Sequence, residues 1–317
     1  MLAEYDALEG LGHACGHHLI AGISALAAIG TAALLRSARG TVHVIGCPAE
    51  ETIGGKALLV RKGVFRGIDA AMMIHPADRT EIVKLSLSMQ RIGVVFRGVS
   101  SHASATPWKG RSALAAMLSL MQAIDANRAT MPEGDRIDGI VRRGGDAANI
   151  VPDLTGAEFF IRSRRMESHR RLLRRFMGMV KGAAKAFGVD YGIEHSGNVY
   201  YPLSPSRTLA DLFAAQVRKY GITIDSLFTD SEMGSSDIGN VSSVVPTIHP
   251  TLAITDRPCP AHSKAFQEHA GTEQAYRSVK TGALLLASTA AEIYKDHSLL
   301  SDLKSNTIFN IVDNRQL

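Results

Sequence analysis

The apolar runs in the first part of the chain predict helices and strands that follow one another in turn. The stretch Leu19–Leu35 carries no charge over 17 residues, and its content of Ala and Gly favours a helix buried in a protein over a membrane span. Strands are predicted at the β-branched run Thr41–Ile45 and the apolar run Ala70–Ile74, with a helix between them at Lys56–Lys62. This order is typical of parallel α/β layering.

The pattern changes near residue 82. Strands are predicted at Ile82–Phe96, Leu154–Arg162 and Val189–Glu194, and helices between them at Ser112–Ala126 and Ser168–Ala186. A β-α-β-α-β order resembles a compact α+β sandwich more than a continuation of the first sheet. We therefore expect a separately packed insertion here.

The α/β pattern resumes after residue 201. A helix is predicted at Leu209–Tyr220, a strand at Val241–Ile248 and a long closing helix at Glu273–Tyr294. The last 20 or so residues are polar and weakly patterned, and are expected to form a loosely attached tail.

These patterns predict one α/β domain interrupted by a smaller domain. The α/β domain is expected to comprise residues 1–84 and 200–317, and the α+β insertion residues 85–199. Hydrophobic residues make up 45% of the chain and charged residues 21%, which is the composition of a globular protein with a sizeable core.

The charge and the cysteine content narrow the class of partner. The formal charge of +5 is mild, and its one local cluster is Arg162–Arg175. Met166, Leu172 and Leu173 interrupt the cluster at roughly helical spacing, so it is predicted to be the solvated face of an amphipathic helix. Nucleic-acid binding is a weaker alternative, because the cluster lacks interleaved aromatic residues.

Three cysteines without a C-x-x-C pair or a signal peptide favour a reducing, cytoplasmic setting.

The segment Gly12–His18 concentrates residues that bind metals. It reads G-H-A-C-G-H-H and therefore holds a cysteine and three histidines within seven residues. Imidazole nitrogen and thiolate sulfur suit zinc and other divalent ions. Cys15 and His17 can reach one site if the segment is a loop, although a surface histidine run with a buried cysteine remains an alternative. His43, inside a predicted strand, is expected to pack in the core.

Further ligand types follow the predicted strands. Glu50 and Glu51 come after Thr41–Ile45, and His75 comes directly after Ala70–Ile74. Sites in open α/β sheets form beyond the carboxyl ends of strands, where one carboxylate can bind metal while its neighbour takes a proton from water. A glutamate pair is usually solvated and a lone histidine usually structural. Together these groups favour a metal hydrolase, and no nucleophile elbow or phosphate-binding loop competes with it.

Several segments together are similar to one known family. Taken in order, the segments resemble the M20 metallopeptidases: EYDALEGLGHACGHH, PAEE, MMIHP, GVSSHASATPWKG, NIVPD followed by FFIRS, and GSSDIGNVS followed by AHSKAF. They look closest to the amidohydrolase branch of this family, which includes aminobenzoyl-glutamate hydrolase-like proteins and related dipeptidases. The resemblance covers about residues 4–294 and implies a zinc-peptidase-like catalytic domain, with a mixed sheet flanked by helices, interrupted by a dimerisation domain. Members of this family usually extend further before the EYDAL segment.

The resemblance implies a two-metal centre holding Zn or Mn, with Co also compatible. Its metal ligands would be Cys15, His17, Glu51, His75 and His262. Glu50 would be the general base, and Asp6 matches a position whose carboxylate orients a ligand. His249 also follows an apolar run and is a rival of His262, but the A-H-S motif favours His262.

The resemblance also implies how substrate is held. His102 is similar to a histidine that enters the partner subunit's site and steadies the carbonyl oxygen. Asn149 and Arg162 match positions that meet the substrate's carboxylate or polarised carbonyl, and Gly234 matches a glycine whose backbone approaches the substrate. We therefore expect a homodimer formed through residues 85–199.

The expected activity is hydrolysis of an amide bond in an N-acyl or aminobenzoyl amino acid or a dipeptide. Neither a nucleic acid nor a membrane is expected as a partner. The alternative is a metal-binding but catalytically impaired homologue that acts as a binding or regulatory protein.

Overall fold

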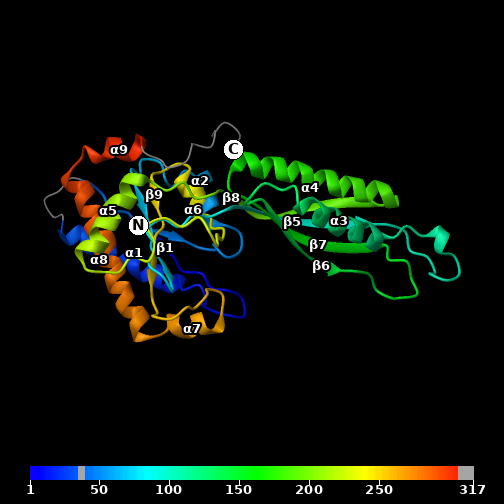
Figure 1. The fold of residues 1–317 in the computed structure, drawn as a ribbon, viewed down its shortest axis with the longest axis horizontal. Coiled ribbons are helices and arrows are strands. Elements are labelled where there is room, and N and C mark those ends of the chain that lie inside the picture. Colours follow the sequence, from blue (N-terminus) through cyan, green and yellow to red (C-terminus); the bar gives the residue numbers. More distant parts are fainter. Residues whose placement is uncertain (35–39, 306–317) are drawn as a thin grey trace. The chain divides into compact units, whose positions relative to one another are not determined.

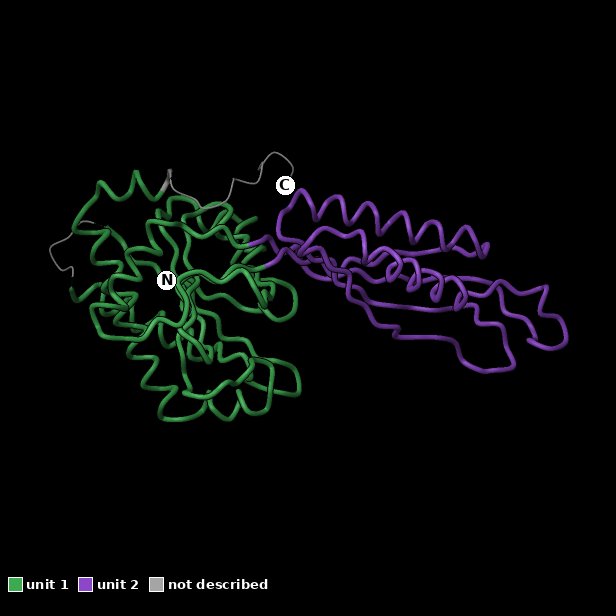
Figure 2. The backbone as a smooth tube through the Cα atoms, in the orientation of Figure 1, with its two compact units in different colours: residues 1–86, 203–317 green, residues 87–202 purple. Residues whose placement is uncertain are grey.

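The computed structural model of the protein describes residues 1–34 and 40–305. The chain forms two compact units, which we call unit 1 (Met1–Ser86 with Leu203–Leu317) and unit 2 (Leu87–Pro202) (Figure 2). The domain boundaries expected after residues 84 and 199 fall two and three residues before those of the units. The fold is α/β, as predicted from the order of elements.

Unit 1 contains three parallel strand pairs among its described residues. They are β1 (Leu2–Glu4) with β2 (Ile45–Cys47), β3 (Ala71–Met72) with β9 (Thr247–Ile248), and β4 (His75–Ala77) with β10 (Thr251–Ala253). The strands before and after the insertion therefore pair with each other. This pairing brings residues near 75 and 250 side by side.

The apolar helix α1 (His17–Leu34) packs against the closing helix α8 (Glu273–Lys295) (Figure 1). The packing is close, since a Cβ added at Gly282 would lie 3.0 Å from the Ile23 side chain. By length and composition α1 is the one described helix that could cross a membrane. Its buried residues, among them Ile20 and Ala27, are those of a core helix.

Unit 1 has five further helices among its described residues. They are α2 (Gly55–Arg61), α5 (Arg207–Lys219), α6 (Ile238–Ser242), α7 (Lys264–Ala270) and α9 (Leu299–Ser305). The predicted strand Val241–Ile248 is wrong over most of its length, because its first residues end helix α6. The predicted tail contains α9, and its remainder lies outside the described residues. His43 is exposed and does not pack in the core.

Unit 2 is a four-stranded antiparallel sheet with two helices. Its strands β5 (Ser88–Arg97), β6 (Arg136–Arg143), β7 (Leu154–Ser163) and β8 (Asp190–Tyr200) lie in the order β6-β7-β5-β8. Helices α3 (Ala113–Arg128) and α4 (Met166–Phe187) pack on the sheet around a core of its own. The sequence did not predict β6, because Ile137 is its only buried residue.

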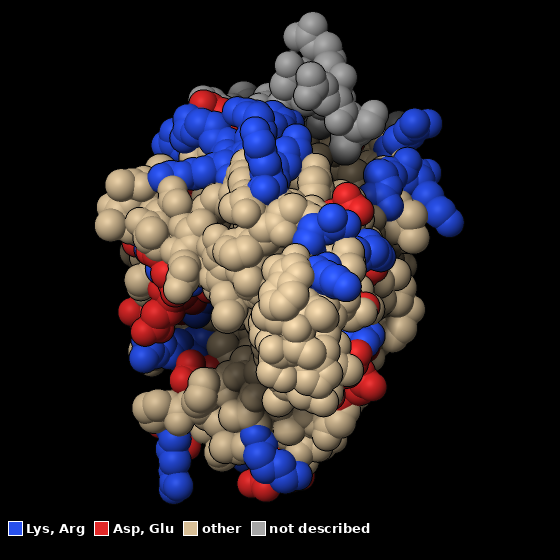
Figure 3. Space-filling view, turned by 90° about the vertical axis from the view of Figure 1, so that its right-hand side faces the viewer, with Lys and Arg blue, Asp and Glu red and all other residues tan. Residues whose placement is uncertain are grey.

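The part of the basic cluster that lies on α4 is exposed, and comprises Arg170, Arg171, Arg174 and Arg175. Leu172 and Phe176 lie on the opposite face of the helix, which packs on the core. Figure 3 shows Lys and Arg side chains gathered along the side of the molecule on which α4 runs in Figure 1. Arg171 pairs with Glu167 at 3.0 Å within the helix. These are features of the solvated amphipathic helix that the sequence predicted.

Candidate metal centre

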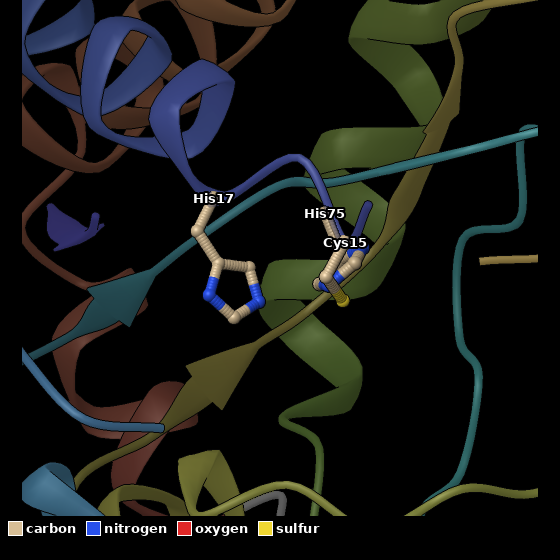
Figure 4. Close-up of side chains that lie close together, drawn as sticks. All are labelled: Cys15, His17 and His75. Atoms are coloured by element: carbon tan, nitrogen blue, oxygen red, sulfur yellow. The ribbon is translucent and has the colours of Figure 1, made fainter. Parts of the chain in front are cut away.

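Four segments of unit 1 bring metal-ligand types together. Their ligand atoms lie within 4.8 Å of one another in three overlapping groups: Cys15, His17 and His75; Cys15, Glu51 and His262; and His17, Glu50 and Glu51. The segment of Cys15 and His17 leads into α1, the glutamates occupy the turn after β2, His75 opens β4, and His262 lies just before α7. Figure 4 shows Cys15, His17 and His75.

The glycine between Cys15 and His17 allows their loop to reach β4. Gly16 has a φ of 77°, and a Cβ there would lie 2.6 Å from the Pro76 side chain. Cys15 Sγ and His75 Nε2 are thereby 3.4 Å apart. His75 Nδ1 donates to the carbonyl of Pro76 at 2.7 Å, so Nε2 is the nitrogen with a lone pair for a ligand bond.

Asp6 orients two of the candidate ligands at once. Its Oδ1 lies 3.2 Å from His17 Nδ1, and its Oδ2 accepts from the Glu51 amide at 3.0 Å. His17 Nε2 consequently faces Glu51 Oε1 at 3.7 Å. Burial acts to lower the pKa of His17, but the Asp6 hydrogen bond and the charge of Glu4 outweigh it and raise the pKa to about 9.

Two residues at the site adopt left-handed backbone without being glycine. Ala49, next to Glu50, has a φ of 58°, and His262 has a φ of 64°. Such conformations cost on the order of 1–3 kcal/mol each and gather at functional sites. The His262 amide donates to the Ala14 carbonyl at 2.8 Å, and this places His262 Nε2 3.4 Å from Glu51 Oε1.

The residues fit divalent metal ions. Burial raises the pKa of the Cys15 thiol, and the charges of Glu51 and Glu50 raise it further, so its thiolate needs a nearby cation. Glu51 Oε1 is buried and faces two imidazole nitrogens, His17 Nε2 at 3.7 Å and His262 Nε2 at 3.4 Å, as expected of groups that share a metal ion. Sulfur, imidazole and carboxylate donors together suit zinc and similar ions.

Glu50 has different surroundings from the ligands. It is 8% exposed, and its carboxylate lies in a ligand group with His17 and Glu51 and in a second group with Glu4 and Asp237. Burial, together with the charge of Glu4, raises the pKa of Glu50 to about 8. A carboxyl group with such a pKa is matched to proton transfer near neutral pH.

The two histidines that competed for the last ligand position lie differently. His262 belongs to a ligand group, whereas His249 belongs to none among the described residues. The His249 ring stands edge-on to His75, with centroids 5.6 Å apart, and its Nε2 is buried without a hydrogen-bond partner. Burial and the neighbouring His75 lower the pKa of His249 to about 3.

Three buried charged residues beside the ligands were missed from the sequence. Lys56 ion-pairs with Glu4 and Asp237, and none of the three is more than 1% exposed. The available signal was Lys56 at the start of the apolar run Ala57–Val60, because a cation is unfavourable in the first turn of a helix.

His102 and Asn149 lie together in unit 2. His102 and Ile150 form an isolated antiparallel β-bridge, and the Ala103 amide donates to the Asn149 carbonyl at 2.9 Å. His102 Nδ1 accepts from the Ala105 amide at 3.1 Å, which leaves Nε2 as the protonated nitrogen. The His102 side chain is exposed and so offers a hydrogen-bond donor outward.

Arg162 lies at the other end of the unit 2 sheet. It is on β7, where it pairs with Met89 of β5, and Met89 is two residues after Leu87, the first residue of unit 2. The Arg162 Nε lies 3.7 Å from Asp138 Oδ2. Leu154, the first residue of β7, is eight positions along the strand from Arg162, which is a distance of about 26 Å. Asn149 comes before Leu154, at that far end of the strand, so Arg162 does not meet Asn149 within one chain. Gly234 is an exposed residue of unit 1, and a Cβ there would meet nothing within 4 Å.

Comparison with known proteins agrees with this geometry. Residues 4–292 match the model of peptidase family M20/M25/M40. The chain is 34% identical to the Xaa-Arg dipeptidase of Mus musculus over 310 residues, covering 96% of this chain and 72% of that protein. It is 31% identical to a component of the p-aminobenzoyl-glutamate hydrolase of Escherichia coli over 205 residues, covering 58% of this chain and 43% of that protein.

Solved structures share the fold. A dinuclear metal-binding peptidase from the M20 family of Bacillus subtilis superposes with a TM-score of 0.66 at 18% identity, covering 93% of this chain and 80% of that one. The match to the family model spans most of the described chain and includes every candidate ligand. The chain therefore belongs to peptidase family M20/M25/M40 and is a hydrolase that acts on amide bonds.

Proposed function

We propose that the protein hydrolyses the amide bond of a dipeptide or of an N-acyl or aminobenzoyl amino acid, with Glu50 as general base. Two divalent ions, Zn or Mn, would be held by Cys15, His17, Glu51, His75 and His262. The observation that carries the proposal is the position of Glu50, whose buried carboxylate adjoins the ligand groups. Its raised pKa suits it to take a proton.

The chemistry divides between the ions and the side chains. Bound ions lower the pKa of water and polarise the substrate carbonyl. Glu50 takes the proton of the attacking water at a carboxylate oxygen and returns it to the leaving nitrogen. Asp6 holds the His17 ring and the Glu51 backbone through its two oxygens, so that both ligand atoms keep their direction during the reaction.

The substrate class rests on the names of relatives. One is a dipeptidase for Xaa-Arg and another a hydrolase of p-aminobenzoyl-glutamate, and both substrates end in an amino acid with a carboxylate. Arg162 would bind that carboxylate, because a guanidinium donates two parallel hydrogen bonds to it. Gly234, without a side chain, would let the substrate approach its backbone.

The geometry of unit 2 supports a homodimer. Arg162 and the loop of His102 and Asn149 lie at opposite ends of β7, about 26 Å apart, whereas a dipeptide spans about 7 Å. One chain cannot bring all three to one substrate. In our proposal Arg162 and His102 of one chain therefore serve different sites, and His102 serves the partner's, donating from Nε2 to the carbonyl oxygen.

The competing hypothesis is a metal-binding homologue impaired in catalysis. Such a protein has no need of a buried general base beside the ligands, yet Glu50 is in place. A measurement of hydrolysis distinguishes this hypothesis from an active enzyme, because both predict bound metal.

The test combines metal analysis with a substrate panel. We expect about two Zn or Mn ions per purified chain and hydrolysis of dipeptides ending in Arg or of p-aminobenzoyl-glutamate. Removal of metal with a chelator should abolish hydrolysis, and Zn²⁺ or Mn²⁺ should restore it. Metal binding without hydrolysis of any N-acyl amino acid or dipeptide would favour the impaired homologue.

A further inference from the structure

A second carboxylate cluster adjoins the metal centre. Oxygens of Glu4, Glu50 and Asp237 lie within 4.8 Å of one another, and each side chain is buried. Three converging buried carboxylates are a site for a divalent cation. Glu50 belongs to this cluster as well as to a ligand group of the metal centre.

The chain places its own cation in this cluster. The Lys56 ammonium ion-pairs with both Glu4 and Asp237, and the Lys56 amide donates to Asp237 Oδ2 at 2.7 Å. Lys56 is fully buried. Burial acts to lower its pKa, but the charges of Glu4 and Asp237 outweigh it and raise the pKa well above the ordinary value. The ammonium therefore stays charged.

The backbone fixes Lys56 relative to the turn that carries Glu50. Lys56 is in the first turn of α2, directly after Gly54, which has a φ of 71°, and Gly55. A Cβ at Gly55 would lie 1.9 Å from the carbonyl oxygen of Pro48. The helix start and the Pro48–Glu51 turn are thus in backbone contact, so the backbone at Lys56 is held against the turn that carries Glu50.

We propose that Lys56 is a positioning residue whose ammonium occupies the Glu4–Glu50–Asp237 cluster in place of a divalent ion and so keeps Glu50 from becoming a metal ligand. The inference rests on the proposed role of Glu50 as general base. A metal–carboxylate bond would engage the oxygen lone pair that must accept the proton. An ammonium supplies one positive charge through hydrogen bonds, which a proton acceptor can break and re-form.

The test is the number of ions bound when the ammonium is removed. Lys56→Met keeps the length of the side chain and removes its charge. After equilibration with Mn²⁺ and desalting, we expect about one more ion per chain than in the wild type, because the three carboxylates then lose the ammonium that they surround. With Glu50 bound to that ion, kcat should fall by at least about tenfold while KM changes little.

Lys84→Met is the matched control. Lys84 also pairs with a buried glutamate, Glu81, at 3.0 Å, but it is one-third exposed and away from the cluster. It should change neither ion number nor kcat. The double variant Lys56→Met, Asp237→Asn removes one charge of each sign and one ligand from the cluster. It should bring the ion number back to that of the wild type.

Each outcome is decisive. If Lys56→Met does not fold in metal-free buffer, Mn²⁺ should restore its circular dichroism spectrum, since the ion replaces the missing charge. Failure to fold even with excess Mn²⁺ would overturn the proposal, as would a lower kcat without an extra ion. An unchanged ion number and kcat would overturn it as well, while a wild type without bound metal would instead refute the proposed function.

Discussion

At the scale of single residues, the environment gives two adjacent carboxyl groups opposite properties. Burial and the charge of Glu4 raise the pKa of Glu50 to about 8. Burial acts in the same direction on Glu51, but the hydrogen bond and charge of His262 outweigh it and lower the Glu51 pKa. We therefore expect Glu51 to bind metal as an anion and Glu50 to exchange a proton.

Glu50→Gln and Glu51→Gln should differ in kind. Glu50→Gln keeps the size of the side chain but cannot take a proton, so kcat should fall by roughly 10²–10⁴-fold with bound metal unchanged. Glu51→Gln replaces an anionic ligand by a neutral amide. It should lower the metal content, and excess metal should restore part of its activity. Metal analysis and steady-state kinetics measure both effects.

If Glu50→Gln lost its metal while Glu51→Gln kept both ions, the roles of the two residues would be the reverse of those proposed. Unchanged hydrolysis in both variants would exclude the mechanism altogether.

His169, in unit 2, links folding stability to pH. It is buried between Ser88 Oγ, 3.0 Å from its Nδ1, and Gln90 Oε1, 3.2 Å from its Nε2. Burial, with a contribution from the charge of Arg170, lowers its pKa to about 4. The unfolded chain therefore takes up this proton first as the pH falls.

The stability that neutral His169 gives is complete above about pH 6.5 and is lost as the pH falls towards 4. The loss is up to about 3 kcal/mol. Urea unfolding at several pH values measures it. His169→Gln, which does not titrate, should show a flatter stability profile between pH 4 and 6.5 than the wild type. Parallel profiles of the two proteins would show that His169 is not the group responsible.

At the scale of elements, one glycine sets how helix α2 meets the turn after β2. A Cβ at Gly55 would come within 1.9 Å of the Pro48 carbonyl oxygen, which is backbone and cannot turn away. The turn carries Glu50 and Glu51, and the helix carries Lys56. The contact between two elements thus aligns three charged side chains.

Gly55→Ala should therefore destabilise unit 1 by roughly 1–3 kcal/mol or more, as overpacking does, and should also reduce metal content. Gly178→Ala is the matched control, since Gly178 is inside α4 and a Cβ there meets nothing within 4 Å. It should be neutral or stabilise by up to about 1 kcal/mol. Equal stability of both variants in denaturant unfolding would contradict the proposed contact.

At the scale of the whole molecule, the separation of Arg162 from His102 makes complementation between chains the sharpest test. Glu50→Gln and His102→Ala should each be nearly inactive. In a mixed dimer, the chain with intact Glu50 receives His102 from its partner. Random reassociation of equal amounts should restore roughly a quarter of wild-type activity, because half the dimers are mixed and each has one complete site.

Light scattering should show dimers throughout, and mixing Glu50→Gln with the wild type serves as the control for dilution. No recovery after verified exchange of chains would place His102 in its own chain's site. Full activity of a monomer would remove the dimer from the mechanism.

The sequence by itself determined the elements with a regular apolar pattern. The predicted helix Glu273–Tyr294 differs from α8 by one residue at its end, and the predicted strand Leu154–Arg162 differs from β7 by one. Their side chains repeat at the period of the element that buries them. β6 has one buried residue and no such repeat, so the pattern could not predict it. The run Val241–Ile248 is too short and irregular for its apolar residues to distinguish a helix from a strand, and its first residues end helix α6.

The sequence also supplied the chemical types of the candidate ligands and placed several of them after strands. It could not show that Cys15, Glu51 and His262 meet within 4.8 Å, because residues more than 200 positions apart meet only through tertiary contacts, such as the hydrogen bond from the His262 amide to the Ala14 carbonyl. Nor could it show that Lys56 is buried between two carboxylates. Local pattern reports which face of an element is apolar, whereas only the packing of elements decides which charges lose water and must pair.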